Sequence, residues 1–280
     1  MRLSTVRIAD DRVTSAARQE GDELVLLPYA DVGALLASGD DWHERAASTR
    51  GERLPLAGAS LAPLVPHPNK IVCLGLNYAT HIKEMGRPTP AHPTLFAKYD
   101  GSLIGANDDI HMPPVSDDLD WEAELGVVVG RSGRHVPREK ALQHVAGYTV
   151  ANDITVRDWQ HRTREFLSGK TFEATTPVGP ALVTPDELPP GASGLDISCS
   201  VDGHTMQKSN TADLLFDVAE TVAYISTIIT LLPGDLILTG TPGGVGAGRD
   251  PKVFLRPGQV LITTVEGIGE LRNTVIKDQL

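Results

Sequence analysis

Aromatic residues and cysteines are scarce in this sequence. Phenylalanine, tryptophan and tyrosine together make up 5% of the 280 residues, and Cys73 and Cys199 are the two cysteines. Cysteines this far apart, without a Cys-x-x-Cys pair, indicate neither a disulfide framework nor a zinc–thiolate site. We therefore expect two buried free thiols.

Basic residues are also in short supply. The chain has 25 lysines and arginines against 36 aspartates and glutamates, which gives a formal net charge of -11 and a pI near 5.2. Because nucleic-acid binding requires a basic surface, this charge argues against a nucleic-acid partner. It also means that an anionic substrate must find positive charge within its own binding site, and a bound metal ion would supply it.

Long apolar runs are missing as well. The N-terminal segment MRLSTVRIADDR has no apolar core of signal-peptide length. The most apolar later stretch, residues 222–232, is too short and too polar to span a bilayer. We expect a cytoplasmic protein without a membrane partner.

The residues that are abundant favour β structure. The 27 glycines and 20 prolines are typical of many short strands joined by tight turns. We predict a mostly β protein with some α structure (α+β), a mixed β roll or barrel with strands at 70–75, 122–129, 145–153, 195–202, 236–240 and 259–265. Longer helices are expected at 156–167 and 211–232, the second capped by Asn210 or Thr211 and ended by Pro233.

Residues 1–66 predict a small N-terminal α+β domain. They contain β-like runs at 3–8 and 23–27 and a helical pattern at 32–37. Prolines at positions 55, 63, 66 and 68 then form a stretch with the composition of a linker. We place the boundary near residue 66, so that residues 67–280 form the larger domain.

Residues 121–130, WEAELGVVVG, give the first indication of chemistry. In a strand, alternation places Glu122 and Glu124 on the same face, with their Cα atoms about 6.5–7 Å apart. Carboxylates this close repel each other unless a cation lies between them, and side chains at this spacing can converge on one metal ion. An isolated Glu-x-Glu is more often part of a solvated strand face. The neighbouring segments therefore determine whether a metal site is expected.

Residues 147–160, GYTVANDITVRDWQ, form the second such segment. Asp153 follows a predicted strand and precedes a predicted helix, which is a usual position for a ligand; alone it would more often be a helix N-cap. Arg157 and Gln160 are three residues apart and share one helical face that looks back at Asp153.

Six segments together resemble the fumarylacetoacetate hydrolase family. In chain order they are GLNYATHIKE (75–84), LFAK (95–98), EAELGVVVG (122–130), GYTVANDITVRDWQ (147–160), GKTFEATTPVGP (169–180) and LTGTPGGVG (238–246). The resemblance covers about residues 68–280. It implies a β-roll fold, a Mg²⁺ or Mn²⁺ centre and a homodimer.

The same resemblance assigns roles to residues. Glu122, Glu124 and Asp153 match the family's metal ligands, and three carboxylates suit a hard divalent ion, for which we expect Mg²⁺, with Mn²⁺ and Ca²⁺ able to replace it. His81 and Glu84 match a catalytic pair on a lid segment, where positions i and i+3 of a helical turn let Glu84 orient His81 for water activation.

Other matched residues concern the substrate. Lys170 matches a lysine near the metal, whose charge would stabilise the negative charge of a transition state. Residues 239–244, TGTPGG, resemble the family's loop that binds the substrate carboxylate through hydroxyl and backbone N–H groups. The predicted substrate contacts are Lys98, Arg157, Gln160, Thr239, Gly240 and Thr241.

These residues predict a metal-dependent hydrolase that cleaves a C–C bond in a 2,4-dioxo acid such as fumarylpyruvate, in the breakdown of aromatic compounds. Water activated by His81 would attack the 4-keto carbon, and a pyruvate enolate would leave. Oxaloacetate decarboxylation and 2-hydroxyhepta-2,4-diene-1,7-dioate isomerisation are alternatives on the same site. A glycosidase pair is disfavoured because Glu122 and Glu124 face one way, and a non-catalytic binding module is disfavoured by His81, Glu84 and Lys170.

Overall fold

The computed structural model describes residues 1–8, 13–84 and 88–278, with the side chains of residues 81 and 84 excepted. The strands are β1 (Arg2–Ile8), β2 (Val13–Glu20), β3 (Glu23–Leu26), β4 (Arg53–Pro55), β5 (Ile71–Gly75), β6 (Thr94–Lys98), β7 (Leu103–Ile104), β8 (Ile110–Met112), β9 (Leu119–Asp120), β10 (Ala123–Val129), β11 (Val145–Asn152), β12 (Thr155–Val156), β13 (Thr176–Val183), β14 (Asp196–Val201), β15 (His204–Asn210), β16 (Leu236–Leu238), β17 (Val260–Val265) and β18 (Gly269–Lys277). The α-helices are α1 (Val32–Leu36), α2 (Trp42–Ser48), α3 (Ala79–Glu84), α4 (Arg138–Ala141), α5 (Arg157–Gln160), α6 (Leu167–Lys170) and α7 (Val218–Ile228). The α+β prediction is confirmed.

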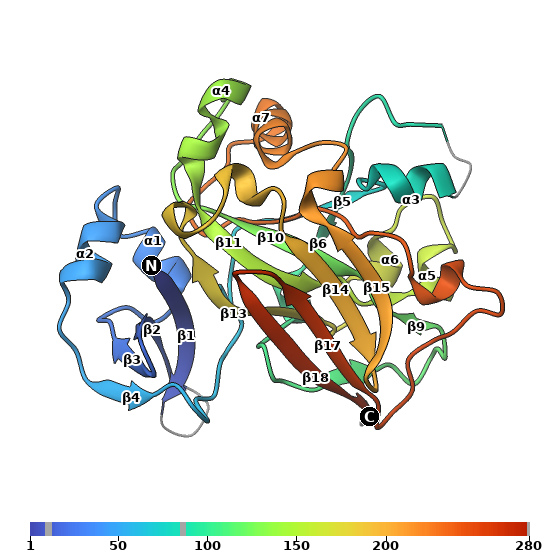
Figure 1. Cartoon of the computed structure of the whole chain (residues 1–280), viewed down its shortest axis with the longest axis horizontal. Coiled ribbons are helices and arrows are strands. Elements are labelled where there is room, and N and C mark those ends of the chain that lie inside the picture. The colour runs from blue at the N-terminus through green and yellow to red at the C-terminus, as the bar shows by residue number, and fades with distance from the viewer. Residues whose placement is uncertain (9–12, 85–87, 279–280) are drawn as a thin grey trace.

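The strands form two large sheets. An 11-stranded mixed sheet has the order β4-β3-β2-β1-β13-β11-β10-β16-β5-β6, with β7 paired to β13. A five-stranded sheet, β15-β14-β17-β18-β8, lies against it, and β9 and β12 form a separate pair. In Figure 1 the strands β14, β15, β17 and β18 cross in front of β10 and β11.

Successive side chains of β10 point into two different hydrophobic clusters. Its side chains Leu125 and Val127 pack in a cluster with Ile197 and Leu261 of the five-stranded sheet. Val128, on the opposite face, packs in a second cluster with apolar side chains of β5 and β16. A strand buried on both faces has a nearly continuous apolar sequence. Glu122, directly before β10, and Glu124, within it, are the exceptions to this pattern.

The N-terminal strands extend the main sheet. β1 pairs antiparallel with β13, with Leu3 opposite Leu182. In Figure 1 the strands β1–β4 and helices α1 and α2 form the blue unit beside the rest of the molecule. The domain boundary near residue 66 stays a prediction.

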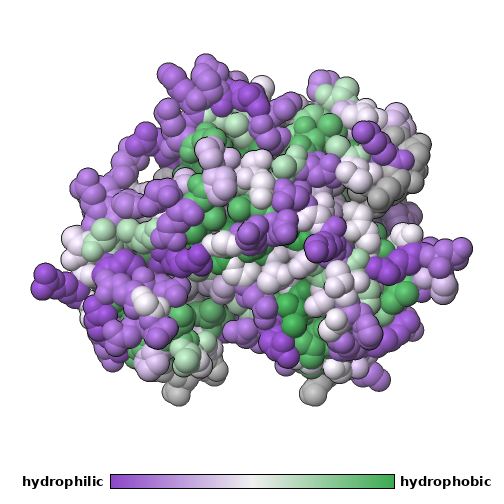
Figure 2. Space-filling model, viewed as in Figure 1, coloured by the Kyte–Doolittle hydropathy of each residue, from purple (hydrophilic) through white to green (hydrophobic). Residues whose placement is uncertain are grey.

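The surface is mostly hydrophilic on the face seen in Figure 2, where green patches are separated by purple and white residues. No described helix is long and apolar enough to cross a membrane, and the longest, α7, has 11 residues. Both cysteines are free and buried, as expected.

The helix expected at 156–167 is wrong in its extent. α5 ends at Gln160, and α6 begins only at Leu167. Between them the Thr163 hydroxyl accepts a hydrogen bond from the Glu165 N–H at 3.2 Å and donates one to the Glu165 carbonyl at 3.0 Å. Such local side-chain bonds compete with helical backbone bonds and favour a turn.

The helix expected at 211–232 is also shorter. A 3₁₀ turn occupies Thr211–Asp213, and α7 spans Val218–Ile228 with Asp217 as its N-cap. The intervening backbone is bound by Asn77: its carbonyl accepts from the Leu215 N–H at 2.8 Å and its side-chain oxygen from the Phe216 N–H at 2.8 Å. A contact 139 residues distant in sequence therefore breaks the helical pattern.

Candidate metal and substrate site

Glu122 and Asp153 lie where two strand ladders are interrupted. The β10–β11 pairing stops at residues 123 and 152, and the β9–β12 pairing resumes at residues 120 and 155. In the gap, the Asp153 N–H donates to the Glu122 carbonyl at 2.9 Å, and the Glu122 N–H donates to the Asn152 side-chain oxygen at 2.9 Å. These bonds satisfy the backbone while both carboxylates turn to one place.

The three predicted ligands meet at this gap. Ligand oxygens of Glu122, Glu124 and Asp153 all lie within 4.8 Å of one another. Glu122 is 8% exposed, and Glu124 and Asp153 are fully buried. Burying carboxylates together is costly unless cations compensate them.

Two lysines provide part of that compensation. The ammonium of Lys170 lies 2.6 Å from Glu122 Oε2 and 2.8 Å from Asp153 Oδ2, and the ammonium of Lys98 lies 2.5 Å from Asp153 Oδ1. Burial alone would raise the pKa of Asp153, but the charges of Lys170 and Lys98 outweigh it and hold that pKa below its usual value. Burial likewise opposes the Lys170 cation, yet Asp153 and Glu122 raise its pKa.

Glu124 forms no ion pair with a lysine or arginine in the part of the chain that the structure describes. Its Oε2 accepts a hydrogen bond from the Gly240 N–H at 2.7 Å, whereas its buried Oε1 has no hydrogen-bond partner among the described residues. Burial, followed by the charges of Asp153 and Glu122, raises its pKa well above the usual value. An orphaned carboxylate oxygen within a cluster of hard oxygen donors fits a divalent cation such as Mg²⁺.

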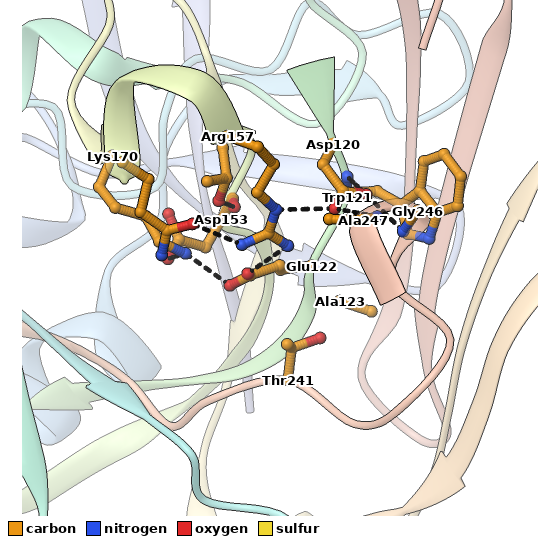
Figure 3. Close-up of polar contacts among 12 residues, drawn as sticks. Asp120, Trp121, Glu122, Ala123, Asp153, Arg157, Lys170, Thr241, Gly246 and Ala247 are labelled. Atoms are coloured by element: carbon orange, nitrogen blue, oxygen red, sulfur yellow. Dashed lines mark hydrogen bonds and ion pairs between the residues drawn. The ribbon is translucent and has the colours of Figure 1, made fainter. Parts of the chain in front are cut away.

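Arg157 adds a third cation beside Glu122. Its guanidinium lies 2.7 Å from Glu122 Oε1, and its Nη1 donates to the side-chain oxygen of Gln160 at 2.9 Å. Burial disfavours the charged form, but Glu122 and Asp120 outweigh this and raise the pKa of Arg157. Figure 3 shows Arg157 and Lys170 approaching Glu122 from two sides.

A pocket with a cavity of about 250 Å³ borders Glu122, Arg157 and Lys170. Its polar and charged lining is Glu122, Arg157, Gln160, His161, Lys170 and Thr241, and its apolar lining includes Leu74, Leu76, Phe96, Phe166 and Val245. A small anion in it would meet Arg157 and Lys170 beside the carboxylate cluster. This combination of a cavity and convergent charged groups is typical of a substrate site.

The sequence comparison decides the family. Residues 70–276 match the family described as Fumarylacetoacetate (FAA) hydrolase C-terminal. The protein is a member of the fumarylacetoacetate hydrolase family. It is therefore an enzyme of a family that includes hydrolases and isomerases.

Relatives within this family have several named activities. The mitochondrial oxaloacetate tautomerase FAHD2A of Bos taurus is 42% identical over 234 residues, which cover 83% of this chain and 74% of that protein. A putative HpcE protein from Mycobacterium smegmatis has a crystal structure that is 34% identical, with a TM-score of 0.89 over 100% of both chains. A fumarylacetoacetate hydrolase from Exiguobacterium antarcticum is 31% identical, with a TM-score of 0.87 over 99% of this chain and 100% of that one.

Residues 239–241 of the loop expected to bind a carboxylate have different surroundings. The Thr239 hydroxyl is buried and donates to the Leu125 carbonyl at 3.0 Å, and Gly240 donates to Glu124. Thr241 lines the pocket. Lys98 is buried in an ion pair with Asp153. Its role as a substrate contact stays a prediction.

The predicted catalytic pair lies on α3. The backbone of His81 and Glu84 belongs to this helix, but both side chains lie outside the described residues. The start of the helix is attached to the 3₁₀ turn before α7, because Asp213 accepts hydrogen bonds from the Thr80 N–H at 3.1 Å and the Thr80 hydroxyl at 2.8 Å. The roles of His81 and Glu84 stay predictions.

Two buried residues at the site were not predicted from the sequence. Asp120 accepts a hydrogen bond from Arg157. It lies two residues before Glu122, so the alternation of carboxylates in the sequence indicates that it shares the face of Glu122 and Glu124. Gln207 accepts from the Ala123 N–H at 2.9 Å and donates to the Thr241 hydroxyl at 2.8 Å. No local pattern marks Gln207, because its partners are distant in sequence.

Proposed function

We propose that this enzyme interconverts the enol and keto forms of a small 2-oxo dicarboxylic acid, with oxaloacetate as the substrate, at a divalent cation. The observation that carries the proposal is the buried carboxylate cluster, in which Glu124 Oε1 has no hydrogen-bond partner among the described residues, beside the pocket cations Lys170 and Arg157. The 42% identity to an oxaloacetate tautomerase supports the choice of substrate.

The chemistry requires stabilisation of negative charge on an enolate oxygen. A divalent cation held by Glu122, Glu124 and Asp153 would supply Lewis acidity toward the keto and carboxylate oxygens of the substrate. Lys170 and Arg157 line the pocket and would place two fixed positive charges near the same oxygens. Because both are already held by carboxylates, little reorganisation is needed when the charge develops.

Tautomerisation also requires one proton to move. From enol to keto, the O–H bond at the C2 oxygen breaks and a C–H bond forms at C3; the reverse reaction breaks the C–H bond and forms the O–H bond. We assign this transfer to His81, oriented by Glu84, the pair that the family resemblance implies. The apolar wall that includes Phe96 and Phe166 would limit water around the substrate.

An enzyme assay tests this proposal. Protein stripped of metal and reloaded with Mg²⁺, Mn²⁺ or Ca²⁺ should accelerate the loss of enol oxaloacetate, followed by its ultraviolet absorbance, above the rate in buffer with the same metal. Glu124→Gln should lose this acceleration, whereas Glu139→Gln, on exposed α4, should keep it. No acceleration with any of the three cations would refute the proposal.

Hydrolysis of an acylpyruvate is the second candidate. It is supported by the similarity to a fumarylacetoacetate hydrolase structure and by the His81–Glu84 spacing on α3. Release of pyruvate from fumarylpyruvate or another acylpyruvate tests it. Decarboxylation of oxaloacetate needs no attacking water, so His81→Ala should impair it less than hydrolysis. Isomerisation of 2-hydroxyhepta-2,4-diene-1,7-dioate is a further alternative on the same site.

Three further properties are proposed from the resemblance. We propose Mg²⁺ as the bound metal, a homodimer as the assembly and the cytoplasm as the location. Metal analysis of protein purified without added metal, sedimentation equilibrium and cell fractionation test them in turn.

A further inference from the structure

Asp120 is buried and accepts four hydrogen bonds. Its Oδ1 accepts from the N–H groups of Trp121 at 2.9 Å and Gly246 at 2.7 Å. Its Oδ2 accepts from the Ala247 N–H at 2.9 Å and from Arg157 Nε at 2.7 Å. One carboxylate therefore joins the strand that leads to Glu122, an arginine of the pocket and a distant loop, as Figure 3 shows.

The distant loop, residues 241–248, is called the substrate loop here. Four of its residues line the pocket: Thr241, Val245, Ala247 and Gly248. Trp121 also holds it, because the indole N–H donates to the Gly244 carbonyl at 3.2 Å. The loop thus depends on two residues that come directly before Glu122.

Close packing leaves the loop little freedom beside Asp120. A Cβ atom on Gly246 would lie 2.8 Å from Asp120 Oδ1 and 1.8 Å from the Val253 carbonyl oxygen. Glycine is therefore required where the loop backbone approaches the carboxylate.

The other partner of Asp120, Arg157, is held along its whole guanidinium. Nε donates to Asp120, Nη1 donates to Gln160, and Nη2 lies 2.7 Å from Glu122 Oε1. Removal of the Asp120 contact would leave the guanidinium held by Gln160 and Glu122 alone and would loosen its placement at the pocket.

We infer that Asp120 is a positioning residue, which fixes the substrate loop and Arg157 in the arrangement that binds the substrate. The inference rests on the proposed function, since it assigns substrate binding to this pocket. Asp120 acts through Arg157 and the loop amides and does not itself line the described pocket. Its loss should therefore weaken substrate binding more than it weakens the binding of metal.

Asp120→Asn is the sharpest variant. The new amide keeps one oxygen that can accept from Trp121 and Gly246, but its NH₂ group would face two donors, the Ala247 N–H and Arg157 Nε. Two of the four bonds would be lost with almost no change in volume.

Asp108→Asn is a matched control. Asp108 also holds an arginine and a loop amide: Arg7 donates to it at 2.9 and 2.6 Å, and the Gly105 N–H donates at 2.7 Å. It is not among the residues that line the pocket.

The experiment measures KM and kcat for oxaloacetate, the Kd of oxalate and the Kd of Mg²⁺, the last two by calorimetry. Asp120→Asn should raise KM and the oxalate Kd by about tenfold or more, with kcat and the Mg²⁺ Kd changed less than about threefold. Asp108→Asn should change none of these. Equal effects of the two variants, or an unchanged oxalate Kd in Asp120→Asn, would overturn the inference.

Hydrogen exchange separates this inference from the proposed function and requires no turnover. In the wild-type protein the Gly246 and Ala247 amides should exchange slowly without ligand, and Asp120→Asn should accelerate Ala247 by about tenfold or more. Fast exchange in the wild type would overturn the inference even if the variant fails to fold. Slow exchange together with oxalate binding but no tautomerisation would sustain Asp120 as a positioning residue and reject the proposed reaction.

Discussion

Lys170 and Asp153 form a buried ion pair, with 2.8 Å between Nζ and Oδ2. Both side chains are at most 2% exposed. The lysine lies where it neutralises part of the charge that would attract a divalent cation, so it both stabilises the carboxylates and competes with metal for them.

Lys170→Met should separate these two effects. Mg²⁺ should bind at least about tenfold more tightly because a buried positive charge is gone, whereas turnover should fall about 10²–10³-fold, as when one donor to a developing oxyanion is removed. Calorimetry and steady-state rates provide the measurements. Lys70→Met is the matched control, since Lys70 pairs with buried Asp235 at 2.8 Å. Weaker Mg²⁺ binding in Lys170→Met would contradict the competition.

Removal of the metal should lower the melting temperature of the wild-type protein. A cation at 100 times its Kd stabilises the folded state by about 2.7 kcal/mol, which chelation would remove. Glu124→Gln keeps an acceptor for the Gly240 N–H but lacks the charge, so its melting temperature should not respond to Mg²⁺. Scanning calorimetry with and without chelator measures both. A Mg²⁺-dependent rise in the variant equal to that in the wild type would show that Glu124 is not a ligand.

The free energy of unfolding should depend on pH in part through the raised pKa of Asp235. Burial raises the pKa of this carboxyl above 3.8, although Lys70 lowers it. Between the unfolded and the folded pKa the native state binds more protons than the unfolded state, so this contribution to stability falls as pH rises. The free energy of unfolding of wild type minus that of Asp235→Asn should therefore decrease as pH increases above 3.8, measured by urea titration.

Asp202 provides a control of opposite sign for this measurement. Its exposed carboxylate accepts from the Val260 N–H at 2.9 Å, and that bond lowers its pKa. The difference between wild type and Asp202→Asn should increase with pH. If both differences change in the same direction, the assignment of one of the pKa shifts is incorrect.

Gly147→Ala should destabilise β11, the strand that directly precedes Asp153. An added Cβ would lie 2.4 Å from the Val183 carbonyl oxygen, a backbone atom that cannot move away easily. We expect a loss of about 1–3 kcal/mol in the free energy of unfolding, measured with urea. Gly101→Ala, where no atom of the described residues lies within 4 Å of the added Cβ, should leave the free energy of unfolding within about 0.5 kcal/mol of wild type.

The sequence predicted those features that depend on local periodicity. Alternation in residues 122–129 placed Glu122 and Glu124 on one face, and the structure brings both to Asp153. The strand predictions succeeded for the same reason, since β10 and β11 are apolar runs bounded by turn residues. The two helices were predicted too long because Asn77 and Thr163 take backbone bonds that a helical pattern cannot reveal.

Contacts between distant segments were not predicted from periodicity, and the meeting of Glu122 and Glu124 with Asp153 was expected only from the family resemblance. The pairing of Lys98 with Asp153 spans 55 residues, and the bond from Gly246 to Asp120 spans 126. Charges at such positions appear in the sequence only as scattered polar residues in apolar surroundings. Asp120 is the exception, because it continues the alternation of Glu122 and Glu124 in the sequence.

The pairing of β1 with β13 has a consequence for shortened forms of this chain. Leu3 lies opposite Leu182, and the Thr184 N–H donates to the Met1 carbonyl at 3.0 Å. A chain that began at residue 67 would leave this edge of the sheet open, with apolar side chains and free amide and carbonyl groups in one row. Such an edge templates strand addition between molecules, so the shortened enzyme should aggregate even if its metal site were intact.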